Sequence, residues 1–182
     1  MKKIILSAVA LVFGVVLQAQ TSNTGNVTLN VHLKPIQTLT INPNADVVDL
    51  TYATKADYAD GVSSKKEDQI SVYSTGGFRV TVKAAGAHLE NNRAGVNGLI
   101  SSNSIKIKAE AGSNALDGAQ YNEVSLDAQT AQTIISSTKG AVDRTFNVDY
   151  KGALDNAYVD YYVDGQDPTT YTTTLTYTIV AQ

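Results

Sequence analysis

The 182-residue sequence contains no cysteine and no tryptophan, and its single methionine is the first residue. Without cysteine the chain has no disulfide bond, no thiolate metal ligand and no cysteine nucleophile. Its 2 histidines are too few for a three-histidine zinc site, and a formal net charge of -3 disfavours nucleic acid as a partner. The sequence also lacks Gly-x-Ser-x-Gly, phosphate-loop and His-Glu-x-x-His motifs. We therefore expect neither an enzyme nor a protein with a resident metal or cofactor.

The first 19 residues have the pattern of a signal peptide. Met1-Lys2-Lys3 is a basic start, residues 4–17 are an apolar run, and Leu17-Gln18-Ala19 offers a cleavage site after Ala19. The apolar run is shorter than the roughly 20 residues that a membrane-spanning helix needs. We therefore expect residues 1–19 to be removed on export. The mature chain, 20–182, is expected to be secreted or held at the cell surface, with no membrane span.

Most of the remaining chain has the pattern of β-strands. Short runs rich in Val, Ile, Thr and Tyr are separated by glycine and asparagine, and Gly76-Gly77 indicates a hairpin turn. Polar residues 53–68 are expected to form a solvated loop, and 126–135 are the one weak helix candidate. The expected strands are 26–34, 36–41, 47–52, 69–73, 78–84, 104–109, 124–126, 132–136, 144–150, 158–163 and 171–180. This number of short strands predicts an all-β, antiparallel sandwich of the Ig-like or pilin-like kind, formed by residues 35–182.

The last expected strand alternates between a core face and a wet face. Tyr171, Leu175, Tyr177 and Ile179 share one face, and threonines occupy most of the other. This pattern is typical of a strand in a sandwich that is covered on one side only.

The region around residues 155–167 is the main candidate for a ligand-contact surface. Oxygen-bearing side chains recur there, as calcium requires, but the same side chains also suit a solvated face. They are Asp155, Asn156, Asp160, Asp164 and Asp167. Tyr158, Tyr161 and Tyr162 form a candidate contact patch for a glycan or a protein, and the alternative is that these rings pack within the domain. His32 and His88 are expected to be ordinary surface side chains.

The first strand of the mature chain suggests a different kind of contact. Val27, Leu29, Val31 and Leu33 occupy one face of residues 26–34, and Pro35 separates this run from the next strand. Residues 20–34 are therefore predicted to be an N-terminal donor strand, which can leave its own domain and add to the sheet of a neighbouring subunit. Burial of four aliphatic side chains contributes about 6–12 kcal/mol before ordering costs. The alternative is that residues 26–41 form one kinked edge strand within their own domain.

This layout of a signal peptide, an alternating N-terminal strand and a Thr/Tyr-rich last strand resembles the exported fimbrial and pilin-like β-sandwich subunits of Gram-negative bacteria. The Ala19-Gln20 junction and the ending at 171–182 resemble secreted proteins of the Bacteroidota. The chain lacks both the cysteine pair of chaperone–usher pilins and the lipobox cysteine of lipoprotein pilins. The resemblance implies a structural subunit of a fimbria- or pilus-like filament, with roles in adhesion and biofilm. It also implies self-association, with Val27, Leu29, Val31 and Leu33 as the donor face in strand exchange.

Two other functions fit the same sequence. One is a monomeric secreted or cell-surface module that binds a glycan, another surface protein or a calcium-dependent partner through the tyrosine region. The other is a small outer-membrane barrel, which the short strands and the scarcity of aromatic residues disfavour.

Overall fold

The computed structural model describes residues 23–91 and 99–182. The expected signal peptide lies outside the described residues. The chain divides after Leu33, and Lys34–Gln182 form a folded domain of antiparallel sheets. Helical structure in the described residues is limited to α1 (Lys55–Asp60) and the short turns η1 (Ser102–Ser104) and η2 (Val159–Tyr161). The prediction of an all-β, antiparallel sandwich is confirmed.

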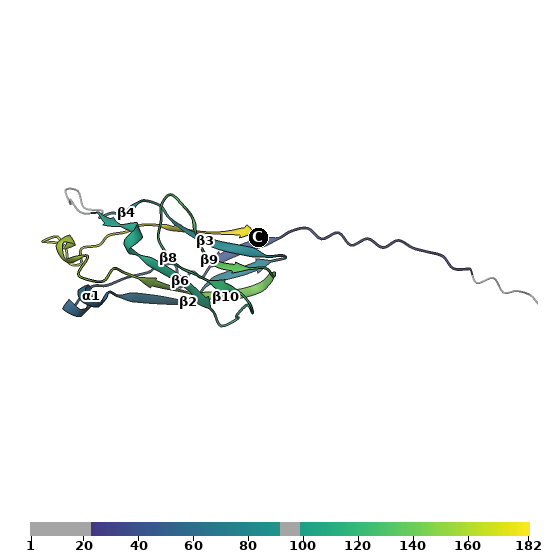
Figure 1. The fold of residues 1–182 in the computed structure, drawn as a ribbon, viewed down its shortest axis with the longest axis horizontal. Helices are drawn as coiled ribbons and strands as arrows, with labels where there is room; N and C mark the ends of the chain where they lie inside the picture. The colour runs from purple at the N-terminus through teal and green to yellow at the C-terminus, as the bar shows by residue number, and fades with distance from the viewer. Residues whose placement is uncertain (1–22, 92–98) are drawn as a thin grey trace, which may run out of the picture. The chain divides into compact units, whose positions relative to one another are not determined.

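Two sheets form the layers of the domain (Figure 1). The five-stranded sheet has the order β1 (Gln37–Ile41), β2 (Ser63–Ser74), β10 (Ala141–Lys151), β6 (Lys106–Ala111) and β8 (Glu123–Ser125). The four-stranded sheet has the order β11 (Leu175–Ala181), β3 (Phe78–Ala84), β9 (Gln132–Ser137) and β7 (Gln120–Tyr121). A small hairpin pairs β4 (His88–Leu89) with β5 (Ile100–Ser101).

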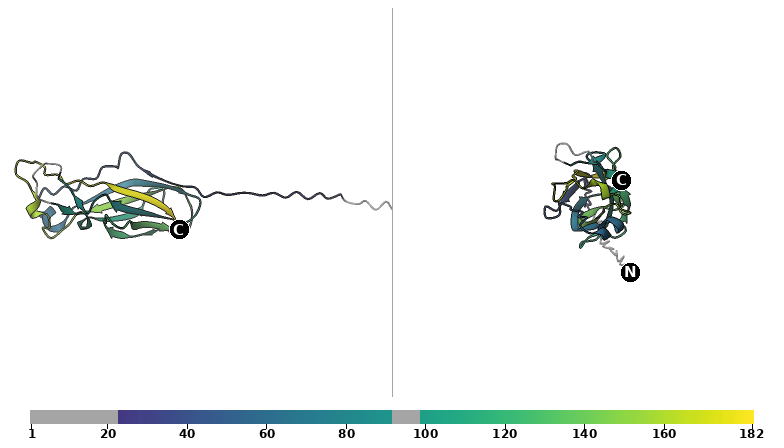
Figure 2. Two further views of the ribbon diagram at one scale, coloured as in Figure 1. Left: turned by 90° about the horizontal axis from the view of Figure 1, so that it is seen from above. Right: turned by 90° about the vertical axis from the view of Figure 1, so that its left-hand side faces the viewer.

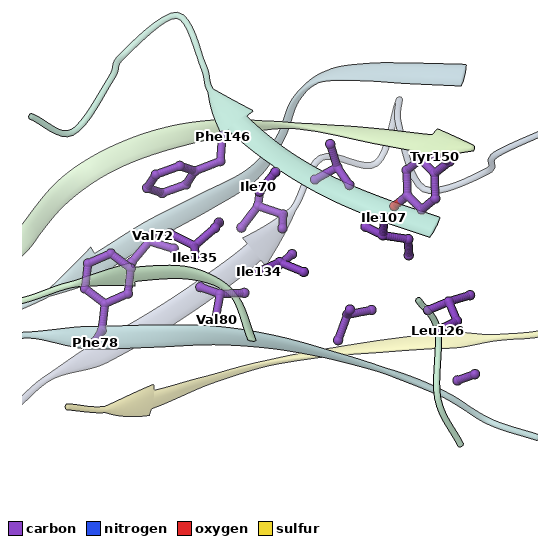
Figure 3. Packing of buried hydrophobic residues seen from close by; sticks show 14 of the residues in the cluster. Ile70, Val72, Phe78, Val80, Ile107, Leu126, Ile134, Ile135, Phe146 and Tyr150 are labelled. Atoms are coloured by element: carbon purple, nitrogen blue, oxygen red, sulfur yellow. The ribbon is translucent and has the colours of Figure 1, made fainter. Parts of the chain in front are cut away.

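The core lies between the two sheets, where side chains from both inner faces meet (Figure 3). Ile70 and Phe146 come from the five-stranded sheet, Val80 and Ile135 from the four-stranded sheet, and all four are 0% exposed. Alternation along β3 and β10 places their inward residues in the core, because every second residue of a strand points to the same face, whereas β9 buries the consecutive residues Ile134 and Ile135. Burial of each such side chain contributes about 1.5–3 kcal/mol.

The domain begins and ends at the same end of the sandwich. The turn after β2 contains Gly76 and Gly77 as predicted, but it joins strands of different sheets and is therefore not a hairpin. The backbone N–H of Thr75 donates to the Ile36 carbonyl, and that of Gln182 donates to the Gly77 carbonyl. We call this the turn end. Helix α1 lies at the opposite end, here called the far end (Figures 1 and 2).

Besides the hairpin at Gly76-Gly77, four sequence-based predictions of local structure are wrong. Residues 53–68 are not a loop, because Thr54 and Asp57 form a capping box that starts α1, and β2 begins at Ser63. Residues 126–135 contain no helix and enter β9 instead. Residues 158–163 are not a strand but the turn η2, where the tyrosines pack against one another. Residues 47–52 belong to no strand, although their side chains alternate as expected of one.

Candidate functional site

The predicted donor face is fully exposed in the structure. Residues 23–35 have no strand assignment, so the strand predicted at 26–34 is not paired with any described part of the chain. Val27 is 93% exposed, Leu29 85%, Val31 76% and Leu33 90%. The central strands of the domain bury their alternate aliphatic residues, as Val80 and Val82 of β3 do completely. We call residues 23–33 the arm; it is the most apolar exposed segment among the described residues.

A second period-two segment is also without a strand partner. Residues 46–52 make no backbone hydrogen bond with another described residue. Their side chains nevertheless alternate, since Val48 and Leu50 are partly buried against the core while Val47 is 65% exposed. We call residues 46–52 the unpaired segment. Its backbone groups are free to form a ladder with an added strand.

Each end of the unpaired segment is held by a side-chain hydrogen bond. At one end Gln69 Nε2 donates to the Ala45 carbonyl oxygen over 2.5 Å. At the other, Tyr52 Oη donates to the Ala153 carbonyl oxygen over 2.6 Å, and burial is the main cause that raises the pKa of Tyr52. Gly152 makes room for the Tyr52 hydroxyl, which a Cβ at that position would overlap. The segment is therefore fixed in place without being part of a sheet.

Two edge strands border the same side of the sandwich. β1 is the edge of the five-stranded sheet and β11 (yellow in Figure 2) is the edge of the four-stranded sheet, and they lie beside each other. Their core-facing residues are only partly buried, unlike those of the central strands. These residues are Leu39, Ile41, Leu175, Tyr177 and Ile179. We call this side of the sandwich the open seam. It consists of β1, the unpaired segment and β11.

The three tyrosines predicted as a contact patch occupy different environments. Tyr158 is 9% exposed, and its hydroxyl is 2.6 Å from that of Ser104. Tyr161 packs edge-to-face against Tyr158, with ring centroids 6.0 Å apart. Only Tyr162, which is 57% exposed, presents most of its ring to solvent. The first two rings therefore serve mainly to hold the far end of the domain together.

The other residues considered from the sequence do not converge on a chemical site. His32 and His88 are both exposed. Within residues 23–91 and 99–182, no three His, Asp or Glu side chains are gathered as a metal ion would require, so the aspartates of 155–167 are not clustered around a common point. No helix in the described part of the chain is long and apolar enough to cross a membrane.

Sequence reasoning missed the open seam. The alternation of residues 47–52 was visible, but it indicated an ordinary strand. The signal that distinguishes an unpaired segment from an ordinary strand is the Asn42-Pro43-Asn44 turn, which follows β1 and interrupts its hydrogen-bond ladder with β2. No protein-family model matches this chain, and no curated protein matches it in sequence.

Proposed function

We propose that this protein is a structural subunit of an extracellular filament, exported through a signal peptide and polymerised by strand addition. The observation that carries the proposal is the arm, whose four aliphatic side chains are 76–93% exposed. A segment with four large apolar side chains exposed gains burial when a partner covers it. The chemistry of strand addition is main-chain pairing together with insertion of alternate side chains.

The occupant that best fits the open seam is the arm of a second copy of this chain. β11 has 7 residues with a free edge, and residues 27–33 span the same length. Their four aliphatic side chains match a row of partly buried Leu, Ile and Val residues along β1, the unpaired segment and β11. Burial of those four side chains contributes about 6–12 kcal/mol before ordering costs, which is enough for a durable contact.

The direction of the added strand determines the kind of assembly. β11 runs toward the turn end, because Leu175 pairs with Ala84 and Ala181 with Phe78. An arm antiparallel to β11 would leave the seam at the far end, and only Lys34, Pro35 and Ile36 separate it from its own β1. The turn end of each subunit would then adjoin the far end of the next. This heterologous contact does not close and so builds a fibre.

A parallel arm gives a different product. It would leave the seam at the turn end, so that two turn ends adjoin and two chains exchange arms reciprocally, which closes a dimer. A filament therefore requires the antiparallel direction. Light scattering distinguishes the two, since an open assembly grows with concentration whereas a reciprocal dimer stops at two copies.

The experiment that tests the donor face compares two double variants of the mature chain. Leu29→Asp with Val31→Asp places two charges on the apolar face, and we expect it to abolish SDS-resistant oligomers. Thr28→Asp with Asn30→Asp adds the same charges to the opposite face of the arm, and this variant should still form SDS-resistant oligomers. If the first variant assembles as well as the second, the arm is not the donor and the proposal is wrong.

A monomeric binding module is the second candidate, favoured by an exposed apolar patch at the far end. Leu154 is 52% exposed, Val159 54% and Tyr162 57%. This candidate predicts a concentration-independent monomer by light scattering. It also predicts that Tyr162→Ala weakens binding to a glycan or protein partner without changing the oligomeric state.

A further inference from the structure

A chain of hydrogen-bonded side chains crosses the otherwise apolar core. The hydroxyl oxygens of Tyr177 and Tyr150 are 2.5 Å apart, and Tyr150 Oη donates to Gln69 Oε1 over 2.7 Å. Gln69 Nε2 in turn donates to the Ala45 carbonyl oxygen. Because the single hydroxyl proton of Tyr150 is committed to Gln69, Tyr177 must donate to Tyr150. We call these four groups the hydroxyl bridge.

The hydroxyl bridge joins the two borders of the open seam. Tyr177 belongs to β11, which is one border, and Ala45 immediately precedes the unpaired segment on the other. Tyr150 and Gln69, which are 3% and 2% exposed, lie on β10 and β2 behind the seam. The side chains of Tyr177, Tyr150 and Gln69 make directional hydrogen bonds. The length of the bridge is therefore fixed by hydrogen-bond geometry and not by the packing of apolar groups.

A strand inserted between two borders needs a definite separation. Because neighbouring strands lie about 4.8 Å apart, an arm that pairs with β11 on one side and with the unpaired segment on the other requires a fixed distance between these two borders. Apolar side chains alone would favour closing the seam, since closure buries the partly exposed Leu and Ile residues along it. A buried, fully satisfied polar network resists that collapse because shortening it breaks its hydrogen bonds.

We propose that the hydroxyl bridge is a positioning device that fixes the separation between β11 and the unpaired segment, where the arm of a second copy is added. Tyr177 and Gln69 are therefore positioning residues, which act on the incoming arm through the borders that they hold. The inference rests on the proposed function, because it assumes that the arm of a second copy occupies the seam.

The test uses the full mature chain and the variant Tyr177→Phe, which removes the hydroxyl and keeps the ring. Tyr121→Phe is the matched control, because Tyr121 is a partly buried tyrosine on the other side of the sandwich with no side-chain hydrogen bond to a described residue. Two quantities are measured: the rate at which labelled subunits exchange between oligomers, and the denaturant midpoint of the same variants carrying Leu29→Asp and Val31→Asp.

We expect Tyr177→Phe to raise the exchange rate about tenfold, in line with the loss of one buried hydrogen bond, and Tyr121→Phe to leave it unchanged. Tyr150→Phe interrupts the bridge from the other sheet and should act in the same direction. The inference is overturned if both bridge variants exchange subunits at the rate of the parent. It is also overturned if the rate rises no more than the change in denaturant midpoint explains. Either result leaves the proposed function standing. If the parent chain never forms oligomers, the proposed function fails and the inference fails with it.

Discussion

The two long sides of the sandwich end in different ways. On one side, β7 and β8 are the edge strands, and the chain passes from one sheet to the other through the single residue Asn122. The Asn122 backbone N–H donates to the Ile134 carbonyl, and Tyr121 packs edge-to-face against Phe146 with ring centroids 6.2 Å apart. This side, the closed seam, is sealed by covalent continuity and by an aromatic contact.

In the described part of the chain, no such single-residue crossing between the sheets closes the open seam, and its aromatic contacts are those that Tyr52, at the end of the unpaired segment, makes with Tyr58 and Tyr158. Its edge strands β1 and β11 are far apart in sequence, and the unpaired segment beside them has no ladder partner among the described residues. Edge strands of this length are normally blunted by charges, prolines or covering loops. The core-facing positions of β11 instead carry Leu175, Tyr177 and Ile179, which remain partly exposed. Under the proposed function, this difference leaves the open seam available to the arm of a second copy.

The largest expected effect is at the closed seam, from Phe146→Ala. Phe146 is 0% exposed and contacts Tyr121, so its removal leaves a cavity and costs about 3–5 kcal/mol of the free energy of unfolding. Because the closed seam does not contact the arm of a partner, the cost should be the same in assembled chains and in chains kept monomeric by Leu29→Asp and Val31→Asp. Urea denaturation of both forms measures it, and a cost under about 1 kcal/mol would contradict this account.

The same kind of truncation at the open seam should depend on assembly. Ile179 is only partly buried in the single chain, so Ile179→Ala is expected to cost about 1–2 kcal/mol in the monomeric form. In assembled chains an added strand covers this position, and the cost should rise by roughly another 1–2 kcal/mol. Equal costs in the two forms would show that no strand covers β11.

The sequence predicted the central strands well because the alternation of apolar and polar residues within each strand is enough to show which side chains are buried. β3 was expected at 78–84 and occupies Phe78–Ala84, since each alternate residue faces the same core. The beginning of β2 was missed because its outward residues are charged. Lys65 pairs with Glu110 on β6 over 2.9 Å, a contact between strands far apart in sequence that no local pattern reveals.

The site was predicted on its donor side only. Val27, Leu29, Val31 and Leu33 form a period-two run that can be recognised in sequence, although its lack of a strand partner among residues 23–91 and 99–182 cannot. The open seam depends on strand order, which brings β1 and β11 together from opposite ends of the domain. The hydroxyl bridge depends on it as well. Gln69 was placed at the start of a strand, but its buried contact with Tyr150 comes from a strand 81 positions later.

High pH should weaken the open seam selectively. Burial is the main cause that raises the pKa of Tyr177 well above its usual value, and burial also raises that of Tyr150. A group with a raised folded pKa contributes stability that is complete below the unfolded pKa, about 10 for tyrosine, and is lost as pH rises toward the folded value. We therefore expect stability to fall above about pH 10, by up to about 1.4 kcal/mol per pH unit for each such tyrosine.

Tyr177→Phe removes one of these titrating groups and should flatten the alkaline loss. Tyr121→Phe is a milder comparison, because burial also raises the pKa of Tyr121 but its hydroxyl is not part of the hydroxyl bridge. Denaturant midpoints measured in steps from pH 8 to pH 11.5 give the slopes. Identical slopes for the parent and Tyr177→Phe would mean that Tyr177 titrates as an exposed tyrosine does.

The smallest expected effect concerns the ion pair of Glu123, on β8 at the closed seam. Its carboxylate is 2.6 Å from Lys151 Nζ, and the hydrogen bond from Lys151 is the main cause that lowers the pKa of Glu123. Because the pKa of Glu123 is lowered in the folded protein, the ion pair adds stability at pH values above the pKa of glutamate in the unfolded chain, about 4.3. This stability is lost as the pH falls through the folded pKa. Because the pair is exposed, Glu123→Gln should cost less than about 1 kcal/mol at pH 7 and nothing at pH 2.5. Urea midpoints at the two pH values measure the difference, and it should shrink in 1 M salt, where exposed charges are screened. If Glu123→Gln still lowers the free energy of unfolding at pH 2.5, Glu123 stabilises β8 through packing and not through its charge.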